Sequence, residues 1–330
     1  MKQTEPENLV MPTDSAQIAF IGFVYRMRIY FREMFPLLIR ITNATLLFVS
    51  FAVMLGIVCD LSIKFDWRLY FLGSFNAFAI ALILRLMDEL KDRDIDRSLF
   101  SERPVPSGRV KETDIKFCLA FVVVIFLMLN AVAQVAFWSA FGLLVYCCLM
   151  FKYFFLPARF KSKLLINLLT HNPIIPLLLL HFVHLIGSWH SLDFDALIKP
   201  QIILLVFMYW GLFLSWEICR KIRYQHEENE YVTYSRLLGR TSTILAVGLV
   251  NKFSLAAGLW ISFHYGLSQI YDVILIAGFA IPAISYTQFL RHKLDNSKQL
   301  KTSAELYAFV VMLAPLLNIV VEGVAHYVSS

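Results

Sequence analysis

Three aspartates recur at a spacing of four residues in one polar segment: Asp88, Asp92 and Asp96, with Glu89 beside the first. Residues four apart share one face of a helix, and like charges in this register repel one another unless a cation compensates them. Mg²⁺ prefers oxygen ligands and commonly uses one or two carboxylates together with substrate phosphates. The row therefore predicts a magnesium site for a phosphate-bearing substrate. The alternative is a solvated loop, because segment 85–116 carries eight acidic and eight basic residues.

A second acidic segment follows much further along the chain. Its carboxylates are Glu217, Glu227, Glu228 and Glu230. The four-residue spacing is absent here, so the sequence alone does not select the glutamates that reach a metal. A basic cluster lies among them, formed by Arg220, Lys221 and Arg223. Guanidinium and ammonium groups suit diphosphate oxygens, so this segment is a candidate partner for the first one, with a solvated loop of mixed charge as the alternative.

Two polar side chains, His171 and Asn172, lie inside a long apolar segment next to Pro173. Proline removes a backbone donor, and inside a membrane this is tolerated where the backbone lines a cavity or packs on protein. Polar groups at such depth are frequently functional. We interpret the pair as candidate substrate-pocket residues, with hydrogen bonding between helices as the alternative.

The composition identifies the elements that must position these groups. Hydrophobic residues make up 58% of the 330 positions and charged residues 16%, against about 25% charged in soluble domains. This balance excludes a soluble enzyme, a disordered chain and a disulfide scaffold, and it argues against a nucleic-acid partner. A membrane-spanning helix needs about 20 mostly apolar residues. Nine such segments are predicted, at 36–59, 67–87, 115–133, 137–156, 163–188, 198–219, 241–263, 268–290 and 305–328.

Basic residues are distributed unevenly between the connecting segments. Lys and Arg gather before residue 41 and in 85–116, 152–163, 220–240 and 291–301. The positive-inside rule then predicts a cytoplasmic N-terminus and an outside C-terminus. The stretch from Gln17 to Pro36 mixes aromatic residues with arginines and predicts an interfacial helix. We therefore divide the chain into a cytoplasmic N-terminal segment, 1–35, and one membrane domain, 36–330.

The acidic row and the turn that follows it resemble the first motif of the UbiA superfamily of intramembrane prenyltransferases. That motif usually reads N-D-x-x-D-x-x-x-D and is followed by an R-P-x-P-S-G turn. Its four polar positions are occupied here by Asp88, Glu89, Asp92 and Asp96, and its turn by Arg103, Pro104, Pro106, Ser107 and Gly108. The departures are Asp88 in place of Asn and Glu89 in place of Asp. The second acidic segment matches the family's second motif loosely, and the nearest equivalent of its Y-x-x-x-K element runs from Phe155 to Arg159, with Lys161 close behind.

The resemblance implies an all-α integral membrane protein with about nine transmembrane helices around a central cavity and two cytoplasmic cap loops. It implies transfer of a prenyl group from a polyprenyl diphosphate to a small-molecule acceptor such as an aromatic ring, with Mg²⁺ as cofactor, in a bacterial inner membrane. Asp88, Asp92, Asp96 and Glu217 are the expected catalytic residues. The expected metal ligands are Asp88, Glu89, Asp92, Asp96, Glu217, Glu227 and Glu228. The expected diphosphate-binding residues are Arg97, Arg103, Arg159, Lys161, Arg220, Lys221 and Arg223.

Two other functions are open at this point. Some UbiA relatives resemble terpene cyclases, which capture the prenyl cation internally and need no acceptor. A transporter is the third reading, although transporters usually carry inverted repeats and ionisable residues near the midplane of the membrane. Here the carboxylates gather at the predicted cytoplasmic edge instead.

Overall fold

The computed structural model describes residues 15–61, 66–155, 164–192, 199–228 and 232–329, and these ranges contain helices and turns but no strand. The first half of the chain forms α1 (Ser15–Glu33), α2 (Leu37–Cys59), α3 (Trp67–Lys91), α4 (Arg93–Leu99), α5 (Glu112–Ala133), α6 (Phe137–Phe151) and the short 3₁₀ turn η1 (Tyr153–Phe155). The second half forms α8 (Leu164–His171), α9 (Ile174–Trp189), α11 (Pro200–Cys219), η2 (Gln225–Glu227), α12 (Tyr234–Leu238), α13 (Arg240–Tyr265), α14 (Gln269–Leu290) and α15 (Lys298–Ser329).

Local sequence signals set several of these helix ends. The Asp66 carboxylate accepts a hydrogen bond of 2.9 Å from the backbone N–H of Arg68 and so caps α3. The Ser268 side chain caps α14 in the same way. Such caps satisfy backbone donors that have no partner within the helix. Glycine sets the C-terminal end of α13, where Gly266 takes a left-handed φ of 68° that terminates the helix.

Eight helical segments in the described ranges are long and apolar enough to cross a membrane, with α8 and α9 counted together as the one segment Leu164–Trp189, and α6, with 15 residues, is a shorter apolar helix. The predicted fourth span, 137–156, is therefore too long. Its end was placed wrongly because Tyr153, Phe154 and Phe155 adopt left-handed φ angles of 48°, 51° and 60° and leave the helix. The predicted fifth span is divided into α8 and α9 at Asn172 and Pro173, since proline cannot donate the next helical hydrogen bond.

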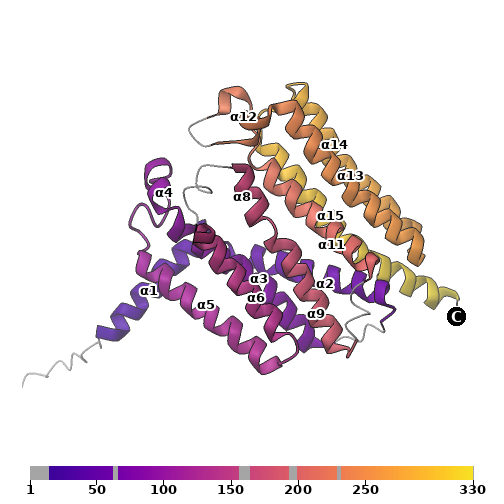
Figure 1. Ribbon diagram of the computed structural model, residues 1–330, viewed down its shortest axis with the longest axis horizontal. Helices are drawn as coiled ribbons and strands as arrows, with labels where there is room; N and C mark the ends of the chain where they lie inside the picture. Colours follow the sequence, from indigo (N-terminus) through magenta and orange to yellow (C-terminus); the bar gives the residue numbers. More distant parts are fainter. Residues whose placement is uncertain (1–14, 62–65, 156–163, 193–198, 229–231, 330) are drawn as a thin grey trace, which may run out of the picture.

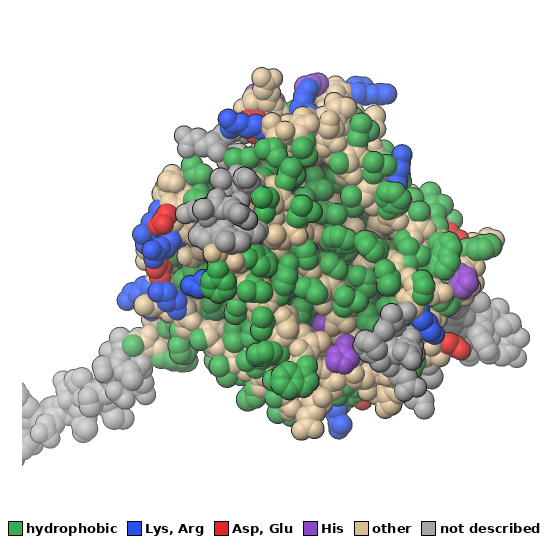
Figure 2. Space-filling view, viewed as in Figure 1, with side chains coloured by type: hydrophobic (Ala, Val, Ile, Leu, Met, Phe, Trp, Pro, Cys, Tyr) green, Lys and Arg blue, Asp and Glu red, His purple; other side chains and the backbone are tan. Residues whose placement is uncertain are grey.

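Helix α2 lies at the centre of the bundle and packs against α3, α9, α11 and α15. On one side of it α3 packs against α5 and α6, and on the other α11 packs against α13 and α15 (Figure 1). One large apolar core joins these helices, and it includes the fully buried rings of Phe48, Phe51 and Phe182. Figure 2 shows apolar side chains over the middle of the visible face and charged side chains towards its edges. This all-helical, membrane-type architecture confirms the predicted fold class.

The polar connections meet at one end of the bundle. Figure 1 shows α4, α8 and α12 at the same end, where α3 and α11 finish and α13 begins. The two acidic segments belong to these connections, because α3 leads into α4 and α11 leads into the loop that carries α12. The fold thus brings residues near position 90 and residues near position 220 to the same end of the molecule.

Candidate functional site

The first acidic row begins on α3 and continues through Asp92 into α4. Helical spacing persists across the junction, because the N–H of Asp92 donates to the carbonyl of Asp88 and the N–H of Asp96 to that of Asp92, both at 2.9 Å. Asp88 is exposed, Asp92 is half-buried and Asp96 is buried. Burial raises the pKa of Asp92, and the nearby Asp96 carboxylate adds to this effect. The row is thus close enough for mutual repulsion, as the spacing predicts.

Arg103 compensates the buried end of this row. Its Nη1 donates to Asp96 Oδ1 at 2.9 Å, and its guanidinium lies 3.7 Å from the centroid of the Phe100 ring. The turn that resembles the family's R-P-x-P-S-G element therefore contacts the acidic row directly. Arg103 is thus brought to the acidic row, where it binds the Asp96 carboxylate in this structure.

Glu89 and Arg97 have partners of their own. The buried Glu89 carboxylate is paired with Arg85, one turn earlier on α3. Arg97 Nη2 donates to Glu112 at the start of α5, at 2.8 Å. Glu89 is thus held by an ion pair within α3, and Arg97 by an ion pair between α4 and α5.

Lys91 and Tyr153 join the site, although neither is among the expected catalytic, metal-binding or diphosphate-binding residues. The Tyr153 hydroxyl donates to Asp92 Oδ1 at 3.4 Å, and Lys91 Nζ lies 3.9 Å from the centroid of the Tyr153 ring. Three successive left-handed residues other than glycine are costly and occur mainly where function constrains the backbone. The only sequence signal for Tyr153 is its place directly after α6, two residues before the expected Phe155.

His171 lies at the same site, whereas Asn172 points to a neighbouring helix. Lys91 Nζ lies 2.9 Å from His171 Nε2, and the Thr170 hydroxyl lies 3.0 Å from His171 Nδ1. The Asn172 side-chain oxygen accepts a hydrogen bond from Nε1 of Trp210 on α11. The break between α8 and α9 therefore supplies one residue to the polar site and one to helix packing.

The end of α11 faces the end of α3. Glu217 accepts hydrogen bonds from Arg220, at 3.0 Å, and lies 3.1 Å from Lys221 Nζ. The charges of Arg220 and Lys221 have only a small electrostatic effect on Asp88 and Asp92, respectively. We call the group formed by Asp88, Lys91, Asp92, Tyr153, His171, Glu217, Arg220 and Lys221 the polar site.

Other predicted residues of the second segment serve its own fold. Glu227 accepts hydrogen bonds from the N–H groups of Tyr224, at 3.0 Å, and Ser297, at 3.1 Å. Glu228 accepts from the hydroxyls of Thr233, at 2.7 Å, and Ser235, at 2.8 Å.

Arg223 Nη1 donates to the Ile222 carbonyl at 2.8 Å and lies 3.5 Å from the Ser297 hydroxyl. In this structure short-range hydrogen bonds hold Glu227, Glu228 and Arg223 within the loop and at its contact with Ser297, so their expected roles in metal or diphosphate binding stay predictions. Arg159, Lys161 and Glu230 lie outside the described residues.

The donor set of the polar site fits Mg²⁺ with a phosphate-bearing substrate. Within the described ranges, no three His, Cys, Asp or Glu side chains gather closely enough to hold a metal by themselves. Mg²⁺, however, is commonly held by one or two carboxylates with substrate phosphates and water completing its shell. Asp88 and Asp92 supply two such carboxylates, and the cationic side chains beside them suit the phosphates.

Comparison with known proteins supports the fold. No protein-family model matches the sequence, and no curated protein is significantly similar to it. The apo structure of a UbiA homolog from Aeropyrum pernix K1 superposes with a TM-score of 0.63 at 14% identity, over 85% of this chain and 98% of that chain. A structure from a study of digeranylgeranylglyceryl phosphate synthase in membranes gives a TM-score of 0.55 at 15% identity, over 89% and 98%. The all-helical membrane fold implied by the sequence resemblance is therefore confirmed, whereas the number of spans, the central cavity and the cytoplasmic cap loops stay predictions.

Proposed function

We propose that this protein transfers a prenyl group from a prenyl diphosphate to a small acceptor at the membrane. The observation that carries the proposal is that α3, which ends in Asp88 and Asp92, and α11, which ends next to Arg220 and Lys221, finish at the same end of the bundle. Anionic and cationic groups are both needed there, because a diphosphate is bound through a metal ion and through direct ion pairs. The similarity to a UbiA homolog and to a synthase structure supports the same class of reaction.

In this proposal the two helix ends divide the work of holding the diphosphate. Asp88 and Asp92 would hold Mg²⁺, which would supply Lewis-acid chemistry by neutralising charge on the leaving diphosphate. Arg220 and Lys221 attract the remaining phosphate oxygens, and Glu217 keeps both cations at the end of α11. Lys91 adds a third cation from the side of α3, fixed by His171 and the Tyr153 ring.

The chemical step breaks the allylic C–O bond, and the diphosphate leaves with the electron pair. The acceptor then forms the new bond to the prenyl carbon and loses a proton. The apolar surroundings of the bundle exclude water, which would otherwise capture the prenyl cation. Placing the polar site at the end of an apolar bundle lets a lipid chain remain in the membrane while its head group reacts.

The test compares two aspartates that differ in position but not in chemistry. Purified protein in vesicles is given labelled geranylgeranyl diphosphate, Mg²⁺ and an aromatic acceptor, and released diphosphate is measured. We expect Asp92→Asn to lower the rate by roughly 100-fold, because a metal-holding carboxylate contributes several kcal/mol to such a step. The control is Asp94→Asn, since Asp94 is exposed and has only a loose ion pair of 3.5 Å with Arg93.

Equal rates in the two variants would contradict the assignment of Asp92. Release of a prenyl hydrocarbon without any acceptor would replace transfer with cyclisation. Loss of release on removing Mg²⁺ with a chelator, and its return on adding Mg²⁺, is expected if the carboxylates hold the metal.

A further inference from the structure

One face of helix α1 contacts the rest of the protein through apolar packing and ion pairs. Its contacting residues are Phe23, Arg26, Met27, Tyr30 and Glu33, which recur at helical spacing. Met27 and Tyr30 are buried in an apolar cluster with side chains of α3 and α5. This face carries two charged residues, Arg26 and Glu33, and both are paired with residues that follow the first acidic segment.

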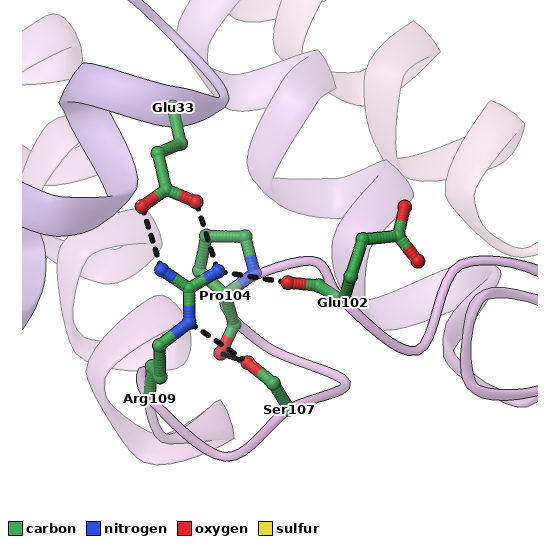
Figure 3. A network of polar contacts seen from close by, with 5 residues as sticks. All are labelled: Glu33, Glu102, Pro104, Ser107 and Arg109. Atoms are coloured by element: carbon green, nitrogen blue, oxygen red, sulfur yellow. Dashed lines mark hydrogen bonds and ion pairs between the residues drawn. The ribbon is translucent and has the colours of Figure 1, made fainter.

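The C-terminal end of α1 is joined to the turn after α4 by a two-pronged ion pair. Arg109 Nη1 donates to Glu33 Oε1 at 2.6 Å, and Arg109 Nη2 donates to Glu33 Oε2 at 2.9 Å. Figure 3 shows that the same guanidinium also reaches the Glu102 carbonyl and the Ser107 hydroxyl, at 2.8 and 3.2 Å. Arg109 thus ties α1 to two separate points of the turn.

The turn between these points is rigid by its own hydrogen bonds. The N–H of Ser107 donates to the Arg103 carbonyl at 2.9 Å, and the N–H of Val110 donates to the Pro104 carbonyl at 2.9 Å. Gly108 supplies the left-handed φ of 78° that the reversal needs. Because the turn keeps its shape, a contact on one side of it fixes the position of Arg103, which holds Asp96 at 2.9 Å.

A second ion pair joins the other charged residue of α1 to the start of α5. Arg26 Nε and Nη2 donate to the two oxygens of Asp114, at 2.6 and 2.9 Å. Asp114 also accepts from the backbone N–H of Lys111, just after the turn, at 3.0 Å. Helix α1 is therefore joined by two ion pairs, through Arg109 and through Asp114, to the segment that follows the turn.

We propose that α1 positions the first acidic segment, with Glu33 and Arg26 as positioning residues that act through the turn and Arg103 on Asp96. This inference rests on the proposed function for its catalytic consequence, but its structural part can be measured without activity. The residues of α1 do not belong to the polar site. Their effect reaches the site because Asp96 lies in the same helical row as Asp92.

The first experiment measures hydrogen exchange of residues 100–110 in the full-length protein in vesicles. Exposed ion pairs change such local equilibria by about two- to fivefold, so Glu33→Gln is expected to speed exchange in the turn by that factor. The control is Arg28→Gln, which neutralises an exposed residue of the same helix that faces away from the turn. Exchange that is unchanged in Glu33→Gln, or equally faster in Arg28→Gln, overturns the proposal.

Charge reversal provides the second arm. The single variants Glu33→Arg and Arg109→Glu place like charges together and are expected to loosen the turn, whereas the double variant restores the pair and its protection. Failure of the double variant to recover slow exchange overturns the role of this ion pair.

The third arm separates positioning from a merely structural role. Glu33→Gln is expected to raise the KM for the prenyl diphosphate about two- to fivefold, with kcat and the unfolding temperature nearly unchanged. A lower unfolding temperature with unchanged KM would instead indicate a structural role alone. If the wild-type protein releases no diphosphate, the proposed function fails, while the exchange measurements still decide whether α1 holds the turn.

Discussion

The ammonium nitrogen of Lys91 lies 2.9 Å from Nε2 of His171, which joins the end of α3 to the break between α8 and α9. An ammonium group only donates, so Nε2 must accept and the hydrogen of this imidazole belongs on Nδ1. The Lys91 ammonium also donates to the Met150 carbonyl at 3.3 Å. A neutral histidine and a carbonyl thus hold the cation at the polar site without cancelling its charge.

Replacing Lys91 with methionine is expected to raise the KM for the prenyl diphosphate by about tenfold or more. A hydrogen bond to a charged group contributes about 1.5–3 kcal/mol, and methionine keeps the length of the chain while removing the charge. Initial rates of diphosphate release against substrate concentration give the KM. Lys116→Met on α5 is the control, because Lys116 is exposed. The same KM in both variants would refute a binding role for Lys91.

The hydroxyl and the ring of Tyr153 can be tested separately. Tyr153→Phe removes the hydrogen bond to Asp92 and keeps the ring below Lys91, so we expect kcat/KM to fall by about three- to tenfold. Tyr153→Leu also removes the cation–π contact, which adds about 0.5–2 kcal/mol, and a larger loss is expected. Rates that match the wild type in both variants would remove Tyr153 from the site.

The helices and the acidic row could be predicted because their signals are local. Apolar runs of sufficient length fix the membrane helices, and the four-residue spacing of Asp88, Asp92 and Asp96 requires only a continuing helix. The second segment could not be predicted in the same way. Whether Glu227 reaches a metal or Ser297 depends on how the loop packs against the start of α15, and no spacing pattern encodes that contact.

Tyr153 and Lys91 are absent from the expected site residues for a related physical reason. The left-handed turn that aims Tyr153 contains no glycine, so its conformation is imposed by the surrounding structure. Lys91 looks like one more charge in a balanced segment, and its role becomes visible only when His171, from a distant helix, lies beside it.

A buried polar group between α3, α5 and α9 is expected to hold these helices in register. The side-chain amides of Asn76 and Asn130 are paired at 2.9 and 3.0 Å, and Asn76 also lies 2.9 Å from His181 Nε2. Asn76→Leu would leave both neighbours without this partner, at a cost of about 1–3 kcal/mol for each buried unsatisfied group. Thermal unfolding in detergent measures the loss. Asn43→Leu, at an exposed position on α2, is the control, and equal stability of the two variants would contradict the prediction.

The same substitution is expected to lower diphosphate release at Glu217 and to leave it nearly unchanged at Glu227. Glu217→Gln weakens the ion pairs that hold Arg220 and Lys221, so diphosphate release should fall by roughly tenfold or more, as for other charged hydrogen bonds. Glu227→Gln should leave release within about twofold, because Glu227 bonds to the backbone of Tyr224 and Ser297. A large loss of release in Glu227→Gln, with normal folding, would instead support the expected role of Glu227 as a metal ligand.

The stability contribution of Glu227 is expected to depend on pH in a defined direction. Burial alone would raise the pKa of Glu227, but the hydrogen bonds from Ser297 and Tyr224 outweigh it and hold the pKa below its usual value of 4.5. A lowered folded-state pKa means that the unfolded chain takes up protons first as the pH falls. The stabilisation is therefore fully present above pH 4.5 and disappears as the pH drops through the lower folded-state pKa. Unfolding temperatures of the wild type and Glu227→Gln should differ most at neutral pH and converge in acid, and a constant difference across this range would show that the carboxylate does not titrate as its hydrogen bonds require.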